Sequence, residues 1–165
     1  MRHRMLPSTV LLLLLLAVLA TALVACGDGA DDGAPGGEAG PVEFVEPQEF
    51  DPGTYAGKPL VVNFFGSWCG PCNAEAPDLA TFAGNNPGVQ FVGIAVNDER
   101  ADVEEFAAEY GLTYPVVLDD NSLSAEYGIT GVPTTIFFDG GGQERDRIVG
   151  SASLLQFEAS LAKAQ

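Results

Sequence analysis

Two cysteines that stand two residues apart place the strongest constraint on this chain. Cys69 and Cys72 follow the run Leu60 to Phe65, whose apolar, β-branched character predicts a buried strand. They are followed by Asn73 to Ala83, which together with Pro71 and Cys72 reads as a helix. A cysteine pair between a strand and a helix is compatible with three kinds of site: a metal clip, a structural disulfide or a working redox pair.

The composition of the chain disfavours a metal site, and the spacing of the two cysteines disfavours a structural disulfide. A zinc clip needs about four ligands, but the chain has three cysteines and a single histidine, His3, near its N-terminus. A structural disulfide that spans two residues closes a very small loop and adds little stability. We therefore predict a redox-active Cys69–Cys72 pair that works with no metal and no other cofactor.

The position of the pair at the start of a helix assigns a role to each cysteine. The N-terminus of a helix carries partial positive charge and free N–H groups, which favour a thiolate at Cys69. Pro71 is tolerated there because the first-turn N–H groups lack partners within the helix. Cys72 lies deeper in the helix. We predict that Cys69 attacks a substrate disulfide and that Cys72 resolves the mixed disulfide.

The N-terminal segment has the layout of an export signal. Positive residues 2–4 precede an uncharged run, residues 10–25, which is shorter than the ~20 residues that span a bilayer. The segment ends in Leu-Val-Ala-Cys26, which resembles a bacterial lipobox, so we expect residues 1–25 to be removed and Cys26 to carry lipid. An ordinary secretory signal is the alternative. Residues 26–41 are rich in Gly, Ala and Asp and are expected to form a flexible acidic tether.

The rest of the chain, residues 42–165, has the composition of a globular domain. The formal net charge of the whole chain is −16, which argues against a nucleic-acid partner, because the chain has few basic residues to neutralise phosphates. Strands and helices alternate and finish in a hairpin, which predicts an α/β fold with one mixed sheet covered on both faces. The expected strands are 42–50, 60–65, 89–96, 115–118, 134–138 and 145–149, and the expected helices are 71–83, 102–110, 122–127 and 153–163.

Two motifs resemble the thioredoxin superfamily. Trp68-Cys69-Gly70-Pro71-Cys72 looks like the thioredoxin active site, and residues 127–135 (YGITGVPTT) resemble the family's second signature. The resemblance covers about residues 42–165. It implies a cis bond between Val132 and Pro133 that faces the cysteines, with the backbone of Val132 pairing with a substrate strand. It also implies that Trp68, Gly70 and Pro71 contact the substrate.

The match is closer to the extracytoplasmic TlpA/ResA/DsbE-like branch. The lipoprotein-like N-terminus suits that branch, and so does an inserted helix and strand between Val96 and Asn121, which lies between the central strand and the cis-proline segment. The branch pattern WCxPCxxExP is matched from Trp68 to Pro77. Asn63 stands where thioredoxin carries a buried aspartate.

Glu75 is a candidate proton acceptor. Residues i and i+3 share a helix face, so Glu75 can approach Cys72. If buried, its pKa rises and it can take the proton that Cys72 must lose. The alternative is a solvated glutamate that stabilises the first helical turn. Asn63 cannot titrate, and we expect it to be a satisfied buried amide that takes no part in the reaction.

The resemblance implies a membrane-tethered reductase of exported proteins that carry disulfides, apocytochrome c among them, with a membrane thiol transporter as electron donor. The same fold also carries disulfide oxidases and isomerases. A peroxiredoxin would need a proline and a hydroxyl residue where Val62 and Gly66 stand. A copper-binding assembly factor would need a histidine as a further ligand, and the only histidine of the chain lies in the expected signal.

Overall fold

A computed structural model describes residues 41–165 of the chain. The expected signal, Cys26 and all of the expected tether except Pro41 lie outside these residues. Within the described part, six strands form one sheet: β1 (Phe44–Val45), β2 (Leu60–Phe65), β3 (Gln90–Val96), β4 (Val116–Asp119), β5 (Thr134–Phe138) and β6 (Glu144–Val149). The α-helices of this part are α2 (Gly70–Asn85), α3 (Arg100–Tyr110), α4 (Ser122–Glu126) and α5 (Leu154–Ala164), and two 3-10 helices are η1 (Pro47–Glu49) and η2 (Pro52–Tyr55).

The sheet is mixed and its order is β1-β4-β3-β2-β5-β6. The β1–β4, β4–β3 and β3–β2 pairs are parallel, whereas β5 runs antiparallel to β2 and to β6. β2 therefore lies near the centre of the sheet, and the helix that carries the cysteines starts at its carboxyl end. The helix and strand expected between Val96 and Asn121 are α3 and β4, and β4 lies between β3 and β1.

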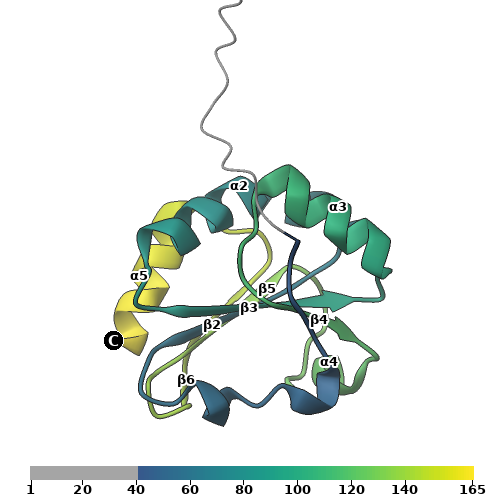
Figure 1. Cartoon of the computed structure of the whole chain (residues 1–165). Coiled ribbons are helices and arrows are strands. Elements are labelled where there is room, and N and C mark those ends of the chain that lie inside the picture. Colours follow the sequence, from purple (N-terminus) through teal and green to yellow (C-terminus); the bar gives the residue numbers. More distant parts are fainter. Residues whose placement is uncertain (1–40) are drawn as a thin grey trace, which may run out of the picture. The chain divides into compact units, whose positions relative to one another are not determined.

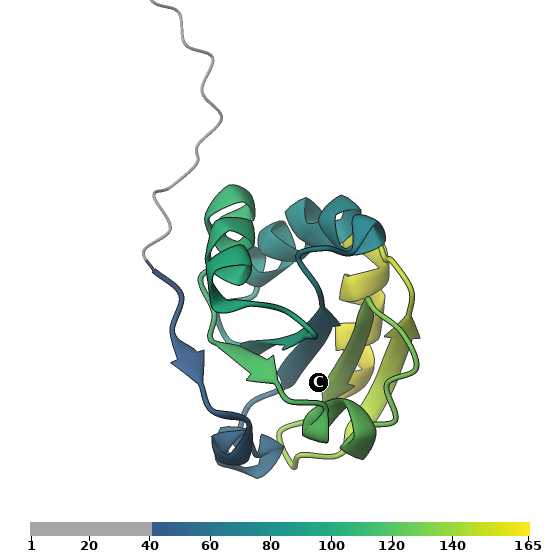
Figure 2. The ribbon, with the colours of Figure 1, turned by 90° about the vertical axis from the view of Figure 1, so that its right-hand side faces the viewer.

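Helices cover both faces of the sheet (Figure 1). α2, α3 and α5 lie on one face, and α4 lies on the other together with η1 and η2, an arrangement that Figure 2 shows from the side. Alternate residues of β2 supply the two cores, since Val61 and Phe65 pack under α2 and α3 while Val62 and Phe64 pack on the opposite face. All six side chains of β2 are buried, as the apolar run predicted.

The alternation of β2 turns one polar residue toward the helices. Asn63 has the same parity as Val61 and Phe65, so its amide faces α2. Its antiparallel partner on β5 is Thr135, and its parallel partner on β3 is Gly93. A Cβ at Gly93 would lie 3.0 Å from the Phe65 ring, so the missing side chain lets that ring pack across β3.

The first strand differs from expectation. The sequence predicts a strand over residues 42–50, but β1 is limited to Phe44–Val45 and η1 begins at Pro47. Proline lacks the N–H that a strand would use, and it is favoured in the first turn of a helix. Phe44 also makes a cation–π contact, because the Arg100 guanidinium of α3 lies 3.9 Å from the centre of its ring.

Candidate active site

The two cysteines lie at the carboxyl end of β2, where α2 begins, and they form a disulfide. Cys69 caps the helix, and its sulfur accepts a hydrogen bond of 3.2 Å from the backbone N–H of Cys72. Cys69 is 4% exposed and Cys72 is 1% exposed, while Gly70 and Pro71 between them are exposed. The N–H that points at Cys69 is the kind of donor that stabilises a thiolate at a helix N-terminus.

The second sequence motif packs against the first. The peptide bond between Val132 and Pro133 is cis, as the resemblance implies. The carbonyl oxygen of Val132 lies 3.7 Å from the sulfur of Cys69. Two segments separated by some sixty residues thus meet at the Cys69 sulfur, where a polypeptide that reaches Cys69 would also meet the backbone of Val132.

Glu75 lies on α2, three residues after Cys72, and is buried, with 3% of its surface exposed. One carboxylate oxygen, Oε1, accepts a hydrogen bond of 3.1 Å from Asn63, and Oε2 accepts one of 2.9 Å from the backbone N–H of Ala152. Burial raises the pKa of Glu75 from 4.5 to about 7, and these two hydrogen bonds offset part of the rise. The carboxyl can therefore gain or lose a proton near neutral pH, which a solvated glutamate could not do.

Asn63 is a buried amide whose hydrogen bonds are satisfied, as predicted. Its NH₂ group donates to Glu75 Oε1 and, at 2.9 Å, to Thr135 Oγ1, so it lies in direct contact with the buried carboxylate. Sequence reasoning missed Thr135 and Ala152 altogether. The strand alternation could have shown that Asn63 faces α2, but no sequence signal marks the backbone N–H of Ala152.

Trp68 is anchored and yet accessible. Its indole N–H donates to the carbonyl oxygen of Val96 at 3.1 Å, while the side chain is 60% exposed. The ring lies over Gly66, where a Cβ would come within 2.6 Å of the indole. Because Gly66 has no side chain, the indole can lie against its backbone and still be largely exposed, which suits the expected contact surface.

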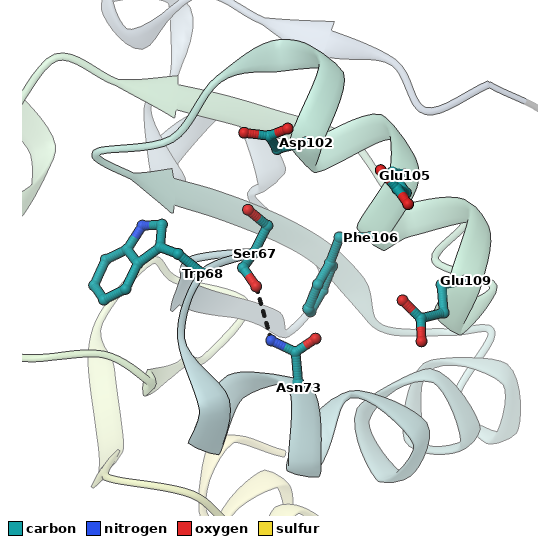
Figure 3. A pocket seen from close by; sticks show the side chains of 7 residues that line it. All are labelled: Ser67, Trp68, Asn73, Asp102, Glu105, Phe106 and Glu109. Atoms are coloured by element: carbon teal, nitrogen blue, oxygen red, sulfur yellow. Dashed lines mark hydrogen bonds between the residues drawn. The ribbon is translucent and has the colours of Figure 1, made fainter.

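Two hollows flank Trp68. One, of about 290 Å³, lies between the start of α2 and the α3 helix (Figure 3). On the α3 side the hollow is lined by the carboxylates of Asp102, Glu105 and Glu109. On the α2 side, the Asn73 amide donates a hydrogen bond to the carbonyl oxygen of Ser67. The other hollow, of about 250 Å³, extends from Trp68 to the segment that precedes Pro133. The acidic wall disfavours the binding of anionic groups in the hollow between Trp68 and α3.

Neither a metal site nor a membrane span is found in the described part of the chain. Among residues 41–165, no group of three or more His, Cys, Asp or Glu side chains is arranged to hold a metal ion. No helix in the same range is long and apolar enough to cross a bilayer.

The sequence of this chain matches a known protein family and several known proteins. Residues 34–161 match the model of the Redoxin family. The chain is 34% identical over 158 residues to the thiol-disulfide oxidoreductase ResA of Geobacillus thermodenitrificans, covering 91% of this chain and 90% of that protein. It is 38% identical over 90 residues to the soluble secreted antigen MPT53 of Mycobacterium tuberculosis, which covers 54% of this chain and 52% of the antigen.

A solved structure with a similar fold supports the same family. A secreted disulfide oxidoreductase of Mycobacterium tuberculosis, described as homologous to DsbE of E. coli, superposes with a TM-score of 0.63 at 31% identity, covering 68% of this chain and 87% of that one. The chain thus belongs to the redoxin family, within the thioredoxin-like fold, and is a thiol–disulfide oxidoreductase of the ResA/DsbE-like kind.

Proposed function

We propose that this protein is an exported lipoprotein, anchored through Cys26, that reduces the disulfides of other exported proteins. The observation that carries the proposal is the arrangement of a buried Cys69–Cys72 disulfide at a helix N-terminus, with a titratable Glu75 below it and the Val132 carbonyl beside it. Apocytochrome c is the substrate class that the resemblance to the ResA/DsbE-like branch favours, with a membrane thiol transporter as electron donor.

The reaction begins with the reduced pair. The Cys69 thiolate attacks one sulfur of the substrate disulfide, the substrate S–S bond breaks, and the departing substrate sulfur leaves as a thiolate that takes up a proton. The resulting mixed disulfide joins Cys69 to the substrate. Helix-terminal N–H donation to the Cys69 sulfur supports this step, because it stabilises negative charge there.

The second step returns the protein to the oxidised state seen here. Cys72 gives its proton to Glu75, and its thiolate attacks the Cys69 sulfur. The Cys69–Cys72 bond forms, the second substrate thiolate leaves, and the substrate has gained the two electrons that the pair has lost. A thiol donor then reduces the pair for another cycle. Glu75 suits this role because its raised pKa lets it accept a proton near neutral pH.

Other functions on the same fold fit less well. In a peroxiredoxin, a hydroxyl side chain would stand where Gly66 lies and a proline where Val62 lies, and Val62 faces the opposite core from Glu75. A copper-binding role lacks its histidine ligand, because the only histidine of the sequence is His3. Oxidase and isomerase activity differ from reductase activity in direction, which the reduction potential decides.

Trapping tests the division of labour between the cysteines. A Cys72→Ser variant should accumulate mixed disulfides with its substrates, because the step that releases them is lost while Cys69 still attacks. Membrane fractions resolved by non-reducing electrophoresis measure the adducts. The Cys69→Ser variant is the matched control and should trap nothing. Equal trapping by the two variants would contradict the assignment of Cys69 as attacker.

The direction of the reaction is tested by equilibrating the Cys69–Cys72 pair with glutathione buffers. A reductase should have a potential more negative than about −200 mV, toward the roughly −270 mV of thioredoxin and away from the about −120 mV of a strong oxidant. The oxidised fraction is measured by alkylation and mass spectrometry. A value near the oxidising end would replace the reductase with an oxidase.

The raised pKa of Glu75 predicts how stability depends on pH. The folded protein holds the Glu75 proton more tightly than the unfolded chain, so ionising the buried carboxyl costs folding free energy. This contribution to the free energy of unfolding is fully present below about pH 4.5 and is lost as the pH rises through about 7. The loss is on the order of 2–4 kcal/mol.

Denaturant unfolding of the oxidised protein between pH 4 and pH 8, the range that spans about both pKa values, measures this effect. The profile of a Glu75→Gln variant should be flatter than that of the wild type over this range. A Glu104→Gln variant, altered at an exposed position of α3, should keep the wild-type slope. Identical slopes in the two variants would show that Glu75 titrates as an ordinary glutamate.

Lipid anchoring has a separate test. A Cys26→Ser variant should move from the membrane fraction to the soluble or secreted fraction, because the residue that accepts the lipid is lost. Immunoblotting of fractionated cells measures the shift. The Cys72→Ser variant should stay with the membrane, and a Cys26→Ser protein that also stays there would contradict the lipoprotein assignment.

A further inference from the structure

A neutral hydrogen-bond network surrounds the Glu75 carboxylate. Asn63, Thr135 and Glu75 are each at most 4% exposed, and they lie on β2, β5 and α2. Asn63 and Thr135 are directly opposed in the β2–β5 ladder, so their side chains emerge side by side on the face that α2 covers. The contact between them follows from strand register and does not depend on a flexible loop.

The two N–H bonds of the Asn63 amide have different acceptors. One donates to Glu75 Oε1 at 3.1 Å and the other to Thr135 Oγ1 at 2.9 Å. An amide NH₂ group has two donors and no acceptor capacity, so it is fully satisfied when it faces these two oxygens. The opposite end of the amide is a carbonyl, which would repel an ionised carboxylate. The carboxylate thus selects the donor-first orientation of Asn63, and the Thr135 hydroxyl, which can accept as well as donate, supplies the acceptor for the second N–H.

The other side of the carboxylate is held by the main chain. The N–H of Ala152 donates to Oε2 at 2.9 Å. Within residues 41–165, the hydrogen-bond donors to Glu75 are thus neutral N–H groups, one on each oxygen. Neutral donors favour the ionised form without the strong stabilisation that a buried lysine or arginine would give. Such a carboxyl stays able to take up a proton.

We propose that Asn63 and Thr135 are positioning residues for the proton transfer from Cys72, with Thr135 holding the Asn63 amide so that its NH₂ group keeps Glu75 ionised and oriented. The proposal rests on the proposed exchange reaction, because the proton in question is the one that Cys72 loses. It gives Asn63 a role in place of the aspartate that thioredoxin carries at this position. An aspartate here could only accept hydrogen bonds when ionised, and it would share one proton with Glu75.

Three other ionisable groups lie near Glu75. Cys72 and Asp78 flank it on α2, and the Asp78 carboxylate is engaged by the backbone N–H of Leu154 at 3.1 Å. The buried Tyr114 phenol lies near enough that the charge of Glu75 raises the tyrosine pKa further above its usual value, after the larger effect of burial. In the oxidised protein Cys72 does not titrate, so measuring Glu75 in that state removes the thiol from the problem.

The experiment is a carboxyl ¹³C NMR titration of the oxidised full chain in detergent micelles, with the Glu75 signal assigned by its loss in Glu75→Gln. Asn63→Leu removes the donor at similar volume and should raise the Glu75 midpoint by about one pH unit, the size expected from one charge-assisted hydrogen bond. Thr135→Val should raise it in the same direction. Thr135→Ser keeps the hydroxyl and should return the midpoint to the wild-type value.

The matched control is Thr81→Val, which removes an exposed hydroxyl of α2 that bonds only to its own helix and should leave the midpoint unchanged. A purely structural role for Asn63 and Thr135 would lower stability without moving the Glu75 midpoint. An unchanged or lowered midpoint in Asn63→Leu, or a Thr135→Ser variant that behaves like Thr135→Val, overturns the proposal. If Asn63→Leu does not fold, the Thr135 pair decides the question alone.

A second measurement links the titration to the reaction. In single-turnover reduction of a model disulfide, the pH midpoint for release of the mixed disulfide should move to higher pH in Asn63→Leu and in Thr135→Val, by the same amount as the NMR midpoint. An NMR shift without a kinetic shift would overturn the role in proton transfer. If the wild-type protein exchanges no disulfide, the proposed function is contradicted. The NMR titration would then still report how Asn63 and Thr135 affect the Glu75 carboxyl.

Discussion

A buried carboxylate, Glu75, joins three separate segments of the domain, and within residues 41–165 its hydrogen-bond donors are neutral N–H groups. Glu75 belongs to α2, and its two oxygens are held by β2, through Asn63, and by the segment before α5, through Ala152. Asp78, one helical turn further along, accepts from Leu154 at the start of α5. Two acidic side chains on one face of α2 thus dock the last helix, and the more deeply buried of them is also the group whose pKa lies near neutrality. Packing and proton chemistry depend on the same contacts.

The elements with local signals could be predicted from the sequence. The apolar run of β2 and the left-handed Gly111 that ends α3 are examples, because strand composition and a glycine cap act over a few residues. The cis bond before Pro133 was expected from the resemblance alone. The proposed active-site residues Cys69 and Cys72 were likewise found without the structure, since their spacing and their place between strand and helix are local.

The surroundings of Glu75 could not be predicted in the same way. That Asn63 meets Thr135 depends on the register of two strands more than seventy residues apart, and register is decided by the packing of whole faces. The contribution of Ala152 comes from its backbone N–H, which every residue other than proline has, so the residue type carries no signal. The short β1 was over-extended in the prediction because alternating residues continue to Phe50, although Pro47 ends strand pairing.

The small size of β1 has a mechanical consequence. Phe44 and Val45 are the first residues of the described chain to join the sheet, and they pair with β4 at its edge. A force applied at the N-terminal side of the domain therefore acts first on the two-residue pairing of β1 with β4 and on the Arg100–Phe44 contact, and only then on β2. Two full strands, β4 and β3, separate that point of loading from the strand that ends at the disulfide. The domain can thus yield at its edge under tension while the geometry around Cys69 is preserved.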